Sequence, residues 1–308
     1  MSGMDMAPEW SAALLAWPAV LAQMLIFGSA MLCLMLTGSD GGHLRTGQAL
    51  ARKLAVRWRI FASIVALLTP LIFINEVAGM AGVSMRSALP LMGEVLTQTQ
   101  SGYTWRWRLP IALALLLAAW VPMRESMRSL ALAVLCAALF LAGSFQSHAI
   151  DFGTMDIALR FVHVLAAGAW TGSLFGYWVG ARSDDSDSQI GIEAAKMLSR
   201  LAAWSVSILI ASGIYIAYEG LGHNLSHVFY SSYGRVLSIK VEVFAVVLMI
   251  GAYNRFFIVP AIDQASSRRT LVRTVGAECL MIIGVVGLAA LLAATPPARM
   301  SMMMSMKP

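Results

Sequence analysis

The stretch WSAALLAWPAVLAQMLIFGSAMLCLML, residues 10–36, holds no charged side chain. About 20 apolar residues in a helix are enough to cross the hydrocarbon core of a bilayer. The run is too long for the apolar region of a cleavable signal peptide, and no basic segment precedes it. It therefore predicts a helix that spans a membrane.

The rest of the chain has the same character. Of its 308 residues, 59% are hydrophobic and 12% charged, about half the charged share of a soluble domain, and the mean hydropathy is +0.74. Lipid offers no hydrogen-bond partner to backbone N–H and C=O groups. Each span is therefore expected to be an α-helix, which pairs these groups within itself. We expect an all-α, polytopic bundle with about eight transmembrane helices and no separate soluble domain. The predicted spans are residues 10–36, 60–82, 104–121, 129–148, 157–180, 201–219, 233–254 and 274–295.

Two segments have a weaker pattern of a membrane-spanning helix than the others. The third predicted span is short and ends at Pro122. The segment 83–103 is long and becomes polar towards its end, so we expect a short helix at the membrane interface there.

The basic residues predict the orientation. One set of loops, with the adjoining span ends, holds fourteen Lys and Arg residues, whereas the opposite set and the two tails hold six. Basic residues accumulate on the cytoplasmic side. Both termini are therefore expected on the outer side, which is the periplasm in a Gram-negative cell.

The sequence gives little support for a nucleic-acid-binding protein, a disulfide-linked protein or an enzyme. The net charge of +6 is explained by topology, and no basic run alternates with aromatic residues, so no nucleic-acid partner is expected. The three cysteines, Cys33, Cys136 and Cys279, are far apart and indicate no disulfide framework. No set of catalytic residues stands out, and we expect no enzymatic activity.

Two histidines fall inside or at the end of predicted spans. His148 ends the fourth span, and His163 lies about two turns into the fifth, so both are expected in the outer half of the membrane. Ionisable side chains in spans usually mark sites or pathways. We interpret the pair as the core of a copper site; the alternative is a histidine that only bonds a neighbouring helix.

Further candidate ligands lie on the same side. His223 and His227 are four residues apart in an outer loop, and they share a face only if that loop is helical; otherwise they are ordinary loop residues. The tail MSMMMSM offers thioethers, which favour Cu(I), while imidazole accepts either copper state. A Met-rich terminus is alternatively a low-complexity tail. The tail ligands are Met302, Met303, Met304 and Met306.

Two more candidates lie in the second predicted span. Met80 follows Glu76 by one turn on the same helical face, in the outer half of the membrane. They are possible further copper contacts. Lys240 is another ionisable residue inside a predicted span; it marks a site, or it only neutralises Glu76 or Glu242.

Four patches of the chain together resemble the copper-resistance protein D family of inner-membrane proteins. The segments SHA (147–149) and HVLAAGAWTGS (163–173) resemble its histidine signature, although Ser147 and Ser173 replace glycines. The likeness covers most of the chain in order. Trp170 lies within the second of these segments. The marker residues of the other patches are Trp105, Arg108, Tyr233, Lys240, Asn254, Arg255 and Glu278.

The resemblance implies a copper-handling protein that moves copper from periplasm to cytoplasm and pairs with a small periplasmic copper carrier. It also implies one membrane domain with an N-terminal four-helix half (1–150), a core half (151–296) and a Met-rich tail (297–308). Two alternatives stay open. The chain is a b-type haem protein with His148 and His163 as axial ligands, or a structural membrane partner of a copper carrier.

Overall fold

The computed structural model describes residues 10–37, 40–146, 153–182 and 188–297. Long helices make up nearly all of this part of the chain, and it contains no strand, so the predicted all-α bundle is confirmed. The long helices are α1 (Trp10–Thr37), α2 (Asp40–Ala81), α5 (Gln100–Trp120), α6 (Glu125–Phe145), α7 (Thr154–Ala181), α8 (Ser188–Gly220), α10 (Ser232–Tyr253) and α11 (Ala265–Ala293).

Short helices join some of the long ones. The segment predicted to hold a short helix contains three, namely α3 (Met85–Ala88), η1 (Leu89–Leu91) and α4 (Met92–Gln98). Residues His227–Tyr230 form α9 before α10. After α10 the chain continues through a π-helical turn, η4 (Asn254–Ile258), and a 3-10 turn, η5 (Val259–Ala261).

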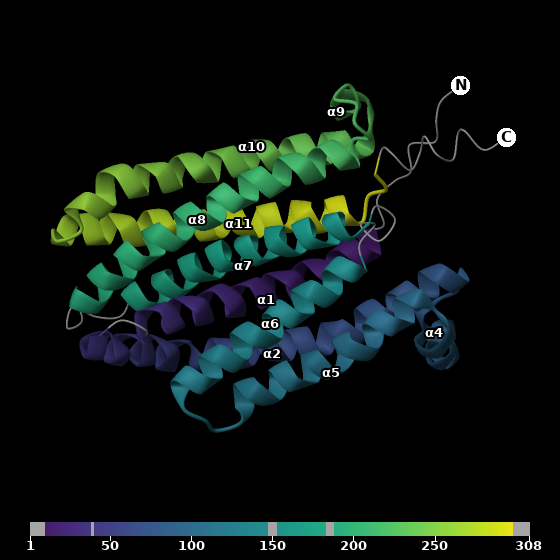
Figure 1. Cartoon of the computed structure of the whole chain (residues 1–308), viewed down its shortest axis with the longest axis horizontal. Coiled ribbons are helices and arrows are strands. Elements are labelled where there is room, and N and C mark those ends of the chain that lie inside the picture. The colour runs from purple at the N-terminus through teal and green to yellow at the C-terminus, as the bar shows by residue number, and fades with distance from the viewer. Residues whose placement is uncertain (1–9, 38–39, 147–152, 183–187, 298–308) are drawn as a thin grey trace.

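Within the described ranges, seven helices are long and apolar enough to cross a membrane: α1, α2, α6, α7, α8, α10 and α11. The one predicted span outside these seven, the third (residues 104–121), corresponds to α5, whose hydropathy is lowered by Arg106 and Arg108. It packs lengthwise against α2 and α6. The start of α1 and the end of α11 lie at the same end of the bundle (Figure 1), and this end is called the terminal end below. A shared end requires an even number of crossings, which supports the prediction that α5 also crosses.

Helix α1 lies in the middle of the bundle, with contacts to α2, α6, α7 and α11 (Figure 1). Its crossing with α7 depends on glycine. A methyl group added to Gly172 would lie 2.2 Å from the Met24 carbonyl oxygen, and one added to Gly28 would lie 2.3 Å from the Gly168 carbonyl oxygen. Small residues let helix backbones approach closely in lipid, where apolar burial gives little drive for helices to pair.

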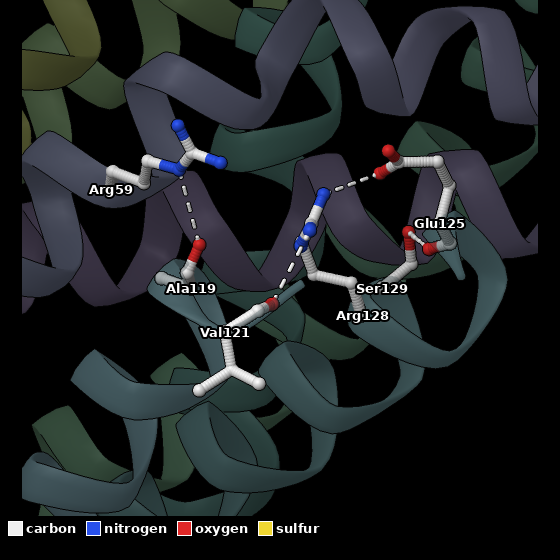
Figure 2. Close-up of polar contacts among 6 residues, drawn as sticks. All are labelled: Arg59, Ala119, Val121, Glu125, Arg128 and Ser129. Carbon is white, nitrogen blue, oxygen red and sulfur yellow. Dashed lines mark hydrogen bonds and ion pairs between the residues drawn. The ribbon is translucent and has the colours of Figure 1, made fainter. Parts of the chain in front are cut away.

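The turn between α5 and α6, at the opposite end, is held by arginines (Figure 2). Arg128 is buried; its Nη1 lies 2.7 Å from Glu125 Oε2, and its Nη2 donates to the Val121 carbonyl at 3.4 Å. From α2, Arg59 Nε donates to the Ala119 carbonyl at 3.4 Å. The last carbonyls of a helix lack partners within it and favour positive charge. These contacts therefore cap α5 and join it to α2 and α6.

Candidate metal-binding site

His163 lies on α7 and faces α8, where its Nδ1 is 2.9 Å from the Ser212 hydroxyl oxygen. The Ser212 hydroxyl donates its own hydrogen to the Ile208 carbonyl at 2.6 Å. The Ser212 oxygen is therefore the acceptor, and Nδ1 carries the ring hydrogen. The lone pair is left on Nε2, which bonds no described residue. A histidine fixed in this way through one ring nitrogen matches the usual arrangement of a metal ligand.

Gly213, which follows Ser212 on α8, leaves space for the His163 ring. A methyl group added to Gly213 would lie 3.3 Å from His163 Cε1. His163 is nine residues from the start of α7, and Ser212 is eight from the end of α8. These spacings correspond to about 14 Å and 12 Å of helical rise from the terminal end. The histidine thus lies inside the half of the bundle that the sequence assigns to the outer side.

Two cations lie near this histidine. Arg160, one turn earlier on α7, and Lys240 on α10 both act electrostatically on His163. Arg160 also acts on Lys240 and on Tyr233 at the start of α10. A bound cation is repelled by these charges, and the repulsion grows in proportion to its own charge.

Glu76 belongs to a separate polar cluster. Its carboxylate accepts hydrogen bonds from the Ser101 hydroxyl and, at 2.9 Å, from Trp105 Nε1. The Arg108 guanidinium stacks on the Trp105 ring at 4.4 Å and bonds Gln146 at the end of α6. These residues join α2, α5 and α6, whereas the partners of His163 belong to α7, α8 and α10. The described contacts do not bring Glu76 together with His163.

Met80 follows the Glu76 cluster at the end of α2. Its side chain is 55% exposed, and no described contact links it to His163. It lies one residue before the end of α2, at the terminal end of the bundle, where α4 also lies (Figure 1). A role as a copper contact stays a prediction.

The loop histidines do not share a helical face. Gly222 and His223 both have positive φ values, of 69° and 62°, so the chain turns between α8 and α9. His223 Nε2 lies 2.6 Å from Glu219 Oε1, whereas His227 Nδ1 lies 2.7 Å from the Leu221 carbonyl oxygen. The condition under which the spacing would pair them, a helical loop, is not met.

Other predicted ligands lie outside the described residues: His148, Met302, Met303, Met304 and Met306. In the described ranges no three His, Cys, Asp or Glu side chains converge in a way that could hold a metal ion. The described residues of these four types therefore do not by themselves make a three-ligand site around His163.

The remaining motif residues make structural contacts. Trp170 is buried and meets the Phe244 ring edge-on at 5.7 Å. Tyr233 packs closely on Gly220 at the end of α8. Asn254 bonds the Glu278 carboxylate and accepts from Thr274 at 2.7 Å, which joins η4 to α11.

Ser212, Gly213 and Arg160 were missed as site residues in the sequence. Arg160 had a usable signal, because it precedes His163 by three residues and therefore shares its face of the helix. Ser212 and Gly213 had none, since they follow His163 by 49 and 50 residues and look like ordinary small residues of a span.

Comparisons with known proteins agree with the earlier resemblance. The family model "Copper resistance protein D-like, N-terminal domain" matches residues 6–156, and the model "Copper resistance protein D" matches residues 192–292. Copper resistance protein D of Pseudomonas syringae pv. tomato is 25% identical over 259 residues, which cover 80% of this chain and 81% of the relative. Inner membrane protein YebZ of Escherichia coli K12 is 24% identical over 249 residues, covering 80% and 83%.

A third relative is longer than this chain. Copper transport protein CutJ of Bacillus subtilis is 24% identical over 162 residues, which cover 51% of this chain and 29% of the relative. No solved structure matches the chain.

Proposed function

Because the chain belongs to the copper-resistance protein D family, a family of multi-pass inner-membrane proteins, we propose that it carries copper ions from the periplasm to the cytoplasm. The observation that carries this proposal is the state of His163. Its Nδ1–H is held by Ser212, and its Nε2 keeps a lone pair in the membrane, where an unused imidazole is costly. The name of the CutJ relative supports a transport role.

The charges around His163 favour Cu(I) as the ion carried. Arg160 and Lys240 repel a monovalent ion half as strongly as a divalent one at the same position. Soft thioether ligands from a Met-rich segment also favour Cu(I). We propose that such a thioether, or His148, completes the coordination, and that a periplasmic copper carrier delivers the ion at the terminal end.

The test compares three variants at the same level of membrane insertion. His163→Ala removes the ligand and should abolish copper uptake in cells that depend on this protein. His163→Met keeps a soft ligand and should retain more uptake than His163→Ala. His227→Ala removes an imidazole that only bonds a loop carbonyl, so uptake should match the wild type.

The accumulated copper is measured by mass spectrometry of washed cells. A stable His163→Ala protein with wild-type uptake would show that His163 is a structural histidine and would overturn the proposal. Ser212→Ala releases the ring hydrogen without removing the ligand, so a partial loss of uptake is expected.

A further inference from the structure

A basic pocket lies at the end of the bundle opposite the terminal end, between α8 and the η4–η5 segment that follows α10. Its volume is about 440 Å³. Three of the six residues that line it are cationic, one is a serine and two are apolar. The residues that line it are Lys196, Ser199, Arg200, Arg255, Phe256 and Val259.

The three cations in this pocket have no carboxylate partner among the described residues. Lys196 and Arg200 are one turn apart on the same face of α8, and their side chains are exposed. Arg255 Nη1 is fixed from across the pocket, because it donates to the Ser199 carbonyl at 2.7 Å and to the Ser199 hydroxyl at 2.8 Å. Its Nη2 and Nε bond no described residue. Within the described part of the chain, the site thus gathers positive charge that no ion pair neutralises.

The π-helical turn contributes to this arrangement. Arg255 is the second residue of η4, and π-helical turns are rare and often occur at functional sites. The same turn carries Phe256, which is 67% exposed and lines the pocket beside the cations. Charged and apolar side chains therefore lie side by side in the lining of the pocket.

The position of the pocket along the helices matches a membrane boundary. Arg200 precedes the end of α8 at Gly220 by 20 residues, and Arg255 follows the start of α10 at Ser232 by 23 residues. These spacings correspond to about 30 Å and 34 Å of rise from the terminal end. The hydrocarbon core is about 30 Å thick, so the cations lie where lipid headgroups begin.

We propose that this pocket binds the phosphate headgroup of an anionic phospholipid. Lys and Arg contact the phosphate oxygens, with the Arg255 guanidinium able to bind two of them, and an acyl chain lies along Phe256 and Val259. Basic pockets between transmembrane helices on the cytoplasmic side are typical headgroup sites. The apolar residues of the lining, Phe256 and Val259, favour a lipid over free phosphate, because only a lipid has a chain to place beside them. The inference does not depend on copper transport.

The test uses the purified full chain in detergent, with bound lipid counted by native mass spectrometry. Phosphatidylglycerol and phosphatidylcholine with the same acyl chains are titrated separately. The pocket variant carries Lys196→Gln, Arg200→Gln and Arg255→Gln, and should bind phosphatidylglycerol roughly 100-fold more weakly, since each cation near an anionic surface contributes about a factor of five. Binding of phosphatidylcholine should be weak in both proteins.

The matched control removes three other exposed arginines of the same basic set, whose side chains bond no residue beyond their own helix: Arg57→Gln, Arg269→Gln and Arg273→Gln. It loses the same net charge and should keep phosphatidylglycerol binding. Equal loss in both variants, or equal binding of the two lipids by the wild type, would overturn the proposal. Displacement of the lipid by inorganic phosphate at the lipid's own concentration would overturn the assignment to a lipid. If the pocket variant fails to fold, Arg200→Gln alone, which breaks no described side-chain contact, should weaken binding about five-fold; unchanged binding would overturn the proposal.

Discussion

Replacing Gly172 by alanine tests the crossing of α1 and α7, which fixes the helix that carries His163. The added methyl group would lie 2.2 Å from the Met24 carbonyl oxygen and 2.7 Å from the Gly28 Cα. Ordinary contact begins at 3.4 Å, so the closest pair must separate by the difference, 1.2 Å. Both obstructing atoms belong to backbone, and a change of side-chain rotamer cannot relieve the overlap.

We expect Gly172→Ala to lower the free energy of unfolding by about 1–3 kcal/mol, the usual cost of overpacking a well-packed interior. Alanine is the better helix former by up to about 1 kcal/mol, and this gain offsets part of the loss. Gly284→Ala on α11 is the matched control, because nothing lies within 4 Å of its added methyl group. It should be neutral or slightly more stable than the wild type.

The assay is equilibrium unfolding in mixed micelles at increasing fractions of a denaturing detergent, followed by tryptophan fluorescence. The difference between the two alanine variants gives the cost of the close approach with helix propensity cancelled. A Gly172→Ala protein as stable as Gly284→Ala would show that the two backbones are not in contact at this crossing.

Three further predictions concern function and topology. Leucine in place of the four tail methionines should lower copper accumulation when copper is scarce and change it little when copper is abundant. The four residues are Met302, Met303, Met304 and Met306. Identical uptake curves at all copper concentrations would show that the tail does not collect copper. A reporter fused after Pro308 should behave as periplasmic, and a cytoplasmic signal would reverse the predicted orientation. Purified protein should give no pyridine haemochrome spectrum, whereas a stoichiometric one would favour the haem interpretation of His148 and His163.

The sequence predicted single residues of the candidate site but not the contacts between them. The sequence indicated His163 as an unusual residue in a span, and this needed only its own neighbours. Its partner Ser212 lies on another helix, and nothing in a run of apolar residues says which helix face will meet it. Glu76 was likewise visible, but its hydrogen bonds to Ser101 and Trp105 depend on α5 packing beside α2.

The spacing of the loop histidines left two interpretations open, and the local backbone decides between them. The spacing of His223 and His227 gives a shared face only if the loop is helical, and otherwise the two are ordinary loop residues. Two successive residues with positive φ, Gly222 and His223, turn the chain instead. A glycine beside the first histidine was the available signal for this turn.

The sequence by itself determined which segments are helices in a membrane, because a bilayer admits backbone only with its hydrogen bonds satisfied and selects long apolar runs without reference to their neighbours. Only the tertiary structure decided which helices touch. Helices that are apolar on every face carry no stripe that marks a partner, and lipid is as apolar as the side chains it replaces. Pairing therefore follows from steric fit, such as that of Gly28 with Gly168 and Gly172. Such steric fit depends on two helix surfaces together and cannot be predicted from the sequence of either helix alone.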